Sequence, residues 1–309
     1  MPTALDIPEF AVRSFETRWG HVVQQQVSKL RDKVTIDEFQ GKEKVYRDLS
    51  TLVWRERLNR LGDSLPQEIQ GYKRKLTKRD FACQHISDRK DAEYIVAQLT
   101  TPGSEIEQAM RMSWNRKVDE MIAQGVSATV YGGAEPYVTP ITLTGGRQVA
   151  VNYVKPGDTP ANSGLTPWKL IELARKFETQ DVFLQGEGAS QVYLAIGPKQ
   201  KQDLYAYVAA SPNDVWAQMM KPFLADESQK LFGFHIVMSN RLTLDGATDV
   251  RTCVAWAREG MVVVPENMQI MVDRLPEKDH AIQVSAYADY GVMRRYEEKV
   301  GEVYCDESP

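Results

Sequence analysis

The clearest periodic pattern in the sequence predicts one long amphipathic helix over residues 104–124. Apolar residues recur there at intervals of three and four, the spacing that gathers side chains on one face of an α-helix. Ser104 and Glu107 match a capping box, which marks a helix start. At 1.5 Å per residue the helix is about 30 Å long, so we expect it to cross a domain as a spine. Its predicted core residues are Ile106, Met110, Trp114, Val118, Met121 and Ile122, while the opposite face carries Glu107, Arg111, Asn115 and Asp119.

Upstream of this helix, the pattern predicts extended structure that buries little. Residues 1–32 are expected to form an arm, because their polar, Gln-rich part has a broken apolar pattern that needs another surface to cover it. Val34 and Ile36 alternate with polar residues within Lys33–Phe39, which favours a strand with both side chains on one face. Apolar residues are then sparse among charges as far as residue 80, which indicates a long excursion rather than a core.

Downstream of the helix, helix and strand signals are mixed. Gly, Pro and Thr dominate residues 125–164, where one strand is predicted at 148–154. Thr166-Pro167 opens an amphipathic helix, whose expected core face carries Trp168, Ile171, Ala174 and Phe177. Further helices are predicted at 201–209 and 211–220, followed by strands at 234–238, 252–256, 261–264, 282–288 and 300–305. The elements together indicate an α+β fold.

The charge is distributed unevenly along the 309 residues, although the net charge is only −4. Residues 29–90 carry 16 Lys and Arg against 10 Asp and Glu, whereas the remainder carries 22 against 32. The basic surplus is densest in a cluster that contains Lys73, Arg74, Lys75, Lys78 and Arg79. This cluster is either a solvated strand face, a contact with acidic surface on another copy, or a nucleic-acid contact. The last is disfavoured, because only Tyr72 and Phe81 offer stacking platforms nearby.

No pattern of catalytic, cofactor-binding or metal-binding residues emerges from the sequence. The phosphate-binding P-loop, the G-x-S-x-G elbow and the H-E-x-x-H helix are absent, and Gly186-Glu187-Gly188 lacks the third glycine of a dinucleotide site. Three cysteines and four histidines are scattered, which disfavours a zinc site and indicates reduced thiols. No apolar run approaches the roughly 20 residues that span a bilayer. We therefore expect neither an enzyme nor a membrane protein.

Several segments resemble the major capsid proteins of tailed bacteriophages. Residues 72–124 are similar to the basic strand, acidic stretch, spine and R-x-x-D helix end of that family, with Arg116 and Asp119 in the last motif. GFHIVMSN at 233–240, TCVAWA at 252–257 and the closing residues 290–308 resemble its later strands. Within 181–198 the sequence departs from the family, since FLQGEGASQVYLAIGP stands where an Asn-Val-Pro turn and a G-R-(Y/F) strand start are usual.

The resemblance implies the Hong Kong 97-type capsid fold. Its expected parts are an N-terminal arm at 1–32, an E-loop at 33–80, a P domain at 81–164 with the spine helix, an A domain at 165–265, and closing strands at 266–309. The implied function is a structural protein whose copies form hexamers and pentamers of an icosahedral head. The implied partners are other copies, portal, scaffold and decoration proteins, and double-stranded DNA bound without sequence specificity, after assembly in the host cytoplasm.

Two other functions stay open at this point. An encapsulin-like nanocompartment shares the fold but encloses a cargo enzyme, and it would lack the long basic excursion. A cytosolic α+β enzyme with a dispersed site would form a monomer or small oligomer, and it leaves the arm and the excursion unexplained. In the capsid interpretation the basic cluster at residues 73–79 contacts a neighbouring subunit, where charge complementarity sets register and orientation.

Overall fold

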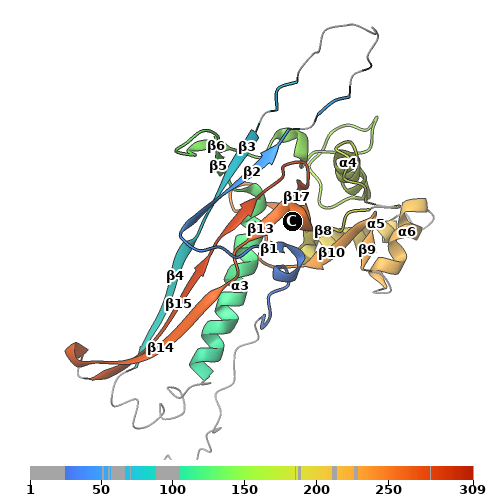
Figure 1. Cartoon of the computed structure of the whole chain (residues 1–309). Coiled ribbons are helices and arrows are strands. Elements are labelled where there is room, and N and C mark those ends of the chain that lie inside the picture. Colours follow the sequence, from blue (N-terminus) through green and yellow to red (C-terminus); the bar gives the residue numbers. More distant parts are fainter. Residues whose placement is uncertain are drawn as a thin grey trace, which may run out of the picture. The chain divides into compact units, whose positions relative to one another are not determined.

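The computed structural model describes residues 25–50, 52–54, 56, 67–69, 71–87, 105–184, 186, 189–210, 214–225, 229–278 and 280–308. Most of the expected arm, part of the excursion and residues 88–104 lie outside these ranges. The chain divides into two compact units (Figure 1). The first unit contains residues 1–27, 83–115 and 270–286, and the second contains residues 28–82, 116–269 and 287–309.

The predicted spine helix is α3, which spans Glu105–Ser127 and so extends three residues beyond the expected end. Four of its predicted core side chains are buried, and Ile106 and Met121 are half-buried. The buried four are Met110, Trp114, Val118 and Ile122. Asp119 departs from the expected pattern, because it lies on the predicted polar face and yet is 0% exposed. Ser104 of the proposed capping box lies outside the described residues.

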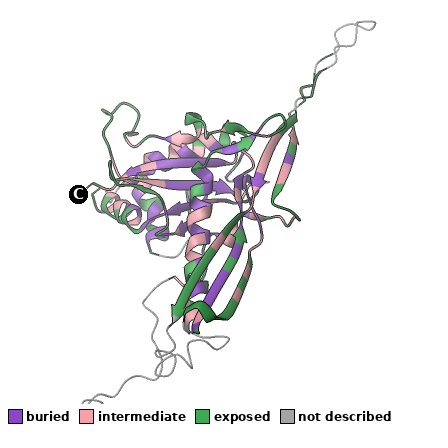
Figure 2. Ribbon diagram, turned by 90° about the vertical axis from the view of Figure 1, so that its left-hand side faces the viewer, coloured by how far each residue is buried: buried purple, intermediate pink, exposed green. Residues whose placement is uncertain are grey.

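A seven-stranded sheet forms the core of the second unit. Its strands lie in the order β7 (Gln148–Val149), β17 (Val300–Asp306), β12 (Val250–Ala257), β8 (Val192–Ile196), β10 (Phe234–Met238) and β9 (Lys230–Leu231), with β11 (Leu244–Asp245) paired to β12. β12 and β17 are antiparallel over seven residue pairs. Buried residues concentrate on these central strands, where Trp256 is fully buried (Figure 2).

Helix α4 (Pro167–Glu178) packs against β17 at close range. Gly301 allows this approach, because a Cβ there would lie 2.9 Å from Leu173 and 3.1 Å from Phe177. Thr166 caps the helix as predicted, by accepting the N–H of Lys169. Of the predicted core face, Phe177 is buried as expected, but Trp168, Ile171 and Ala174 are only half-buried. The buried stripe runs instead through Leu170, Leu173 and Phe177.

The other helices of the second unit are α5 (Pro198–Ala210) and α6 (Val215–Leu224). α5 is longer than the predicted helix at 201–209. α6 begins after Asp214, the last residue of the predicted opening Ser211-Pro212-Asn213-Asp214, and ends at Leu224 rather than at Met220. The Asp214 side chain accepts the N–H of Trp216 at 3.4 Å, and such an N-cap aspartate satisfies a backbone N–H that has no partner in the helix.

Two predicted strands are much shorter than expected. Only Thr35–Ile36 (β1) forms a strand within 33–39, as an edge on β13 (Met261–Val263) after the 3₁₀ turn Arg31–Lys33. Val34 is 1% exposed but Ile36 is 49% exposed, because a two-residue edge strand covers too little of the sheet to bury both. Within 148–154 the strand ends at Val149, where the chain turns and Tyr153 N–H donates to the Ala150 carbonyl at 3.1 Å.

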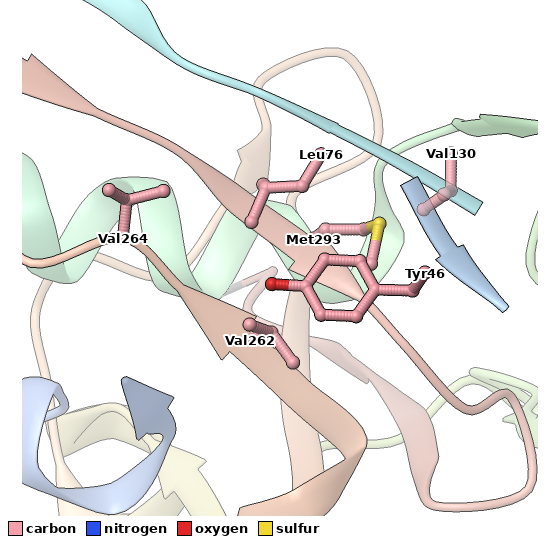
Figure 3. Close-up of a cluster of buried hydrophobic side chains, with 6 residues drawn as sticks. All are labelled: Tyr46, Leu76, Val130, Val262, Val264 and Met293. Carbon is pink, nitrogen blue, oxygen red and sulfur yellow. The ribbon is translucent and has the colours of Figure 1, made fainter. Parts of the chain in front are cut away.

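The base of the excursion belongs to the core, contrary to the expectation that this region buries little. β2 (Glu43–Leu49) and β3 (Gly71–Thr77) form a sheet with β5 (Val130–Gly132) and β6 (Thr139–Ile141) in the order β2-β3-β5-β6. Tyr46 and Leu76 pack with residues from β5, β13 and β16 (Val292–Arg294) and their flanks (Figure 3). The buried cluster comprises Tyr46, Leu76, Val130, Val262, Val264 and Met293.

A third sheet contains β14 (Asn267–Leu275), β15 (Ala281–Tyr290) and β4 (Arg79–Ser87), in that order. β14 was not predicted, because its apolar and polar residues follow no clean alternation and most of them are exposed. β15 alternates better in its second half, where Ala286, Ala288 and Tyr290 are buried and Tyr287 and Asp289 are exposed. Among the helices that the structure describes, none combines the length and hydropathy needed to cross a bilayer.

Candidate functional site

The strands β2 and β3 form a two-stranded ribbon that ends in an exposed apolar tip. The strands pair over seven residues, from Glu43 opposite Thr77 to Leu49 opposite Gly71. Beyond and beside the last pair, six large apolar side chains are 53–100% exposed: Leu49, Leu52, Val53, Trp54, Ile69 and Tyr72. We call these six residues the ribbon tip. Soluble monomers rarely expose a group of large apolar side chains of this kind, so the ribbon tip is a candidate contact surface.

Two aspartates fix the ribbon to the rest of the second unit, Asp37 at its base and Asp48 next to the last strand pair. Asp37 accepts hydrogen bonds from Lys44 Nζ at 2.6 Å and Tyr46 Oη at 2.7 Å. Asp48 accepts from Arg295 Nη2 at 2.9 Å and Tyr296 Oη at 3.1 Å. The ribbon therefore has an anchored base and an exposed tip.

These hydrogen bonds favour the charged carboxylates. The bonds from Lys44 and Tyr46 lower the pKa of Asp37. Burial acts to raise the pKa of Asp48, but the bonds from Arg295 and Tyr296 outweigh burial and lower the pKa overall. A group whose folded-state pKa is lowered stabilises the fold above its ordinary pKa, and that contribution is lost as the pH falls through the folded value.

The two aspartates therefore predict an acid-sensitive attachment of the ribbon to the second unit. Replacing Asp37→Asn or Asp48→Asn should cost about 1 kcal/mol each at pH 7, and the cost should shrink when unfolding is measured below pH 3.8, the ordinary aspartate value. Urea unfolding at pH 7 and pH 3 measures both. Asp158→Asn, in an exposed loop, is the matched control and should change stability at neither pH. A cost that is equal at both pH values would contradict the assignment.

In the structure, most residues of the predicted basic cluster contact residues of their own chain. Arg74 donates to the Arg294 carbonyl at 3.1 Å and lies 3.7 Å from Glu297. Lys75 lies 3.2 Å from Glu43 across the ribbon. These contacts leave both side chains largely covered. The Arg74 contacts attach the ribbon to the rest of its own subunit, whereas the Lys75–Glu43 pair joins the two strands of the ribbon.

The remaining three basic residues lie around the ends of β3. Lys73 lies over the ring of Tyr137 at 5.7 Å. Lys78 donates to the Phe39 carbonyl at 2.7 Å and lies 4.4 Å from the centre of that ring. Arg79 is exposed, so its guanidinium is the one in this cluster most open to another molecule. The role of the cluster in subunit contacts stays a prediction.

Cysteine and acidic side chains do not form a metal centre in the described part of the chain, where no three His, Cys, Asp or Glu residues gather suitably. Cys253 and Cys305 are both buried, with their sulfur atoms 4.0 Å apart. The hydrogen bond to Cys305 and burial raise the pKa of Cys253. Cys83 is exposed on β4.

Comparison with known protein families matches residues 7–307 to a family described as phage capsid protein. The chain belongs to the phage capsid protein family. The resemblance seen in the sequence is thus confirmed, and the α+β fold matches that of phage capsids. This phage capsid protein is a structural protein, the major protein of a viral capsid.

Solved structures share the fold of this phage capsid protein. A chain of Mycobacterium phage Che8 is 12% identical, with a TM-score of 0.63 over 96% of this chain and 98% of that chain. A chain from the capsid of Ralstonia phage GP4 is 10% identical, with a TM-score of 0.65 over 100% and 99%. One from the capsid of Myoviridae phage XM1 is 14% identical, with a TM-score of 0.63 over 97% and 98%. No curated protein matches the chain.

Asp119 ties the start of the second unit to the spine helix of the phage capsid protein. Its carboxylate accepts the Ser28 hydroxyl at 2.5 Å, the Lys29 N–H at 3.0 and 3.1 Å, and the Leu30 N–H at 3.1 Å. The path of the chain after residue 27 is therefore fixed by one buried side chain. Helical periodicity placed Asp119 on the polar face of the helix. The only sequence signal that set this residue apart was the R-x-x-D motif, which resembles the helix end of the capsid family.

Arg294 holds the end of the spine helix, and sequence reasoning missed it. The side chain is fully buried. Its Nη1 donates to the carbonyls of Val126 and Ala128, and its Nη2 donates to the Ile141 carbonyl at 3.1 Å. The last carbonyls of a helix have no partner within it, so Arg294 supplies a donor to the buried Val126 carbonyl at this helix end.

Proposed function

We propose that this capsid protein assembles through its ribbon into hexamers and pentamers of an icosahedral head around double-stranded DNA. The observation that carries the proposal is the ribbon tip, six exposed apolar side chains on an anchored base. A contact between a tip and a different surface of the next copy is heterologous, and such contacts close into rings when the rotation between copies permits.

Charge supports the same arrangement. The basic surplus of residues 29–90 can meet the acidic surplus in the rest of a second copy, which favours register and orientation more than raw affinity. We further propose an arm at 1–32, an E-loop at 33–80, a P domain at 81–164, an A domain at 165–265 and closing strands at 266–309. We also propose that the basic cluster contacts a neighbouring subunit and that the protein has no catalytic activity. Portal, scaffold and decoration partners, DNA packaging without sequence specificity, and assembly in the host cytoplasm also belong to the proposal.

The proposal predicts closed particles when the protein is expressed alone or with its scaffold. Electron microscopy should show shells or capsomers tens of nanometres across, and sedimentation should show material far larger than one chain. A compact 35.0 kDa particle at every protein and salt concentration would contradict the proposal and favour a monomeric α+β enzyme. Shells that enclose a co-purifying enzyme would favour the nanocompartment interpretation.

A further inference from the structure

The second unit contains an open cavity of about 400 Å³ beside the base of the ribbon. Its walls come from the C-terminal half of α3, from β3 and β5, and from the chain around β16. Met121, Tyr131 and Val292 supply apolar surface, and Tyr131 is 49% exposed. An exposed tyrosine at the wall of a hollow leaves apolar surface that a partner side chain would cover.

Two cations line the same cavity. Lys75 and Arg79 belong to the basic cluster, and the cavity lining contains no Asp or Glu among the described residues. Cations beside an apolar wall favour an aromatic ring, because the face of the ring attracts positive charge. A volume of about 400 Å³ is near the lower end of ligand pockets, which span roughly 300–1,000 Å³. The cavity therefore suits one large aromatic side chain.

Trp54 of the ribbon tip is a large aromatic side chain that is not buried in its own copy. It is 100% exposed, so in its own copy it lies wholly outside the cavity. Tryptophan is strongly enriched among residues that dominate binding energy at interfaces, where it fills a pocket on the partner. Since the projecting side chain and the cavity belong to different places on one chain, their pairing between copies is a heterologous contact.

We propose that Trp54 of one copy docks into this cavity of the next copy. The indole lies against Met121 and Val292, and Arg79 faces the ring. This inference rests on the proposed function, namely assembly through the ribbon, and adds the anchor side chain and its acceptor. It also gives Arg79 a role in the subunit contact, as a cation over an aromatic ring rather than as a partner of a carboxylate.

Photo-crosslinking tests the docking directly. Trp54→p-benzoylphenylalanine places a bulky photoreactive ring at the tip, and irradiated assemblies are separated on a denaturing gel and mapped by mass spectrometry. We expect bands of two or more linked copies, with the cross-link in residues 75–79, 121–131 or 290–293 of a different copy. Cross-links between copies at any other segment would overturn the docking while leaving assembly through the ribbon intact. Failure of the unmodified protein to form particles would instead contradict the proposed function.

Substitutions supply a second test that does not depend on the photoreactive residue. Trp54→Ala should raise the protein concentration needed for assembly at least about tenfold, and Trp54→Phe should restore part of the loss. Ala128→Trp, at an exposed position on the cavity lining, should block the acceptor to a similar extent. Leu52→Ala is the matched control on the ribbon tip, with a smaller effect. All four should keep the wild-type melting temperature. Normal assembly by Trp54→Ala would overturn the docking.

Discussion

A chain in which residues 50–70 are replaced by Asn-Gly is expected to fold with nearly wild-type stability and to remain unassembled. Leu49 and Gly71 are the last pair of the ribbon, and a two-residue Asn-Gly loop joins paired antiparallel strands without changing their register. The described residues of the deleted segment include none of the buried core, whereas Leu52, Val53, Trp54 and Ile69 are exposed. We expect a change in unfolding free energy within about 1 kcal/mol, since surface changes are usually small.

Sedimentation and thermal unfolding separate the two parts of this prediction. A control keeps the loop at full length but replaces Leu52, Val53, Trp54 and Ile69 with Ser, and it should lose assembly equally. If the shortened chain forms normal shells, the ribbon tip is not the subunit contact. If it melts early and without cooperativity, the removed residues contribute to the core.

Arg294→Met is expected to destabilise the isolated subunit by about 3–5 kcal/mol, the usual cost of removing one partner from a buried charged network. The fully buried guanidinium donates to three carbonyls, from Val126, Ala128 and Ile141. Methionine fills similar space but donates nothing, so the buried Val126 carbonyl is left without this donor. Burial lowers the pKa of Arg294, and the nearby charge of Glu297 acts against that shift.

The control for this prediction is a pair on the surface. Arg175 and Glu172 form an ion pair at 2.6 Å on α4, with the Arg175 side chain 63% exposed. Arg175→Met should cost only about 0–1 kcal/mol, the usual range for exposed pairs. Arg294→Lys should fall between the two, because an ammonium cannot reproduce the fork of a guanidinium. Equal unfolding free energies for Arg294→Met and Arg175→Met would show that the buried network contributes little.

Local patterns predicted the elements whose stability is mainly local. The strand at 234–238 and the cap at Thr166 appear as expected, because alternation and capping depend on neighbours in sequence. The buried face of α4 could not be assigned, since apolar residues such as Trp168 and Ile171 flank the true stripe and only the approach of Gly301 selects it.

The candidate site was only partly predictable for a similar reason. The basic cluster was visible as a run of charges, but Arg74 meets Arg294 and Glu297 more than 200 residues away. In the sequence, Arg294 cannot be told apart from an exposed arginine near the end of a strand. Its three acceptor carbonyls lie far away in sequence, and only the tertiary structure brings them to the guanidinium. The cavity that accepts an aromatic ring is likewise assembled from elements far apart in the sequence, among them α3, β3, β5 and β16, so no sequence window contains it.

The position of β17 in the sheet sets the order of events during synthesis. This strand lies between β7 and β12, yet residues 300–306 are translated after every other strand of the sheet. A chain still growing on the ribosome therefore has β7 and β12 without the strand that joins them. Because domains fold as units once their parts have emerged, the second unit matures only after this strand leaves the ribosome. Fragments from early termination lack a central strand, so we expect them to be unable to complete the sheet at the core of the second unit.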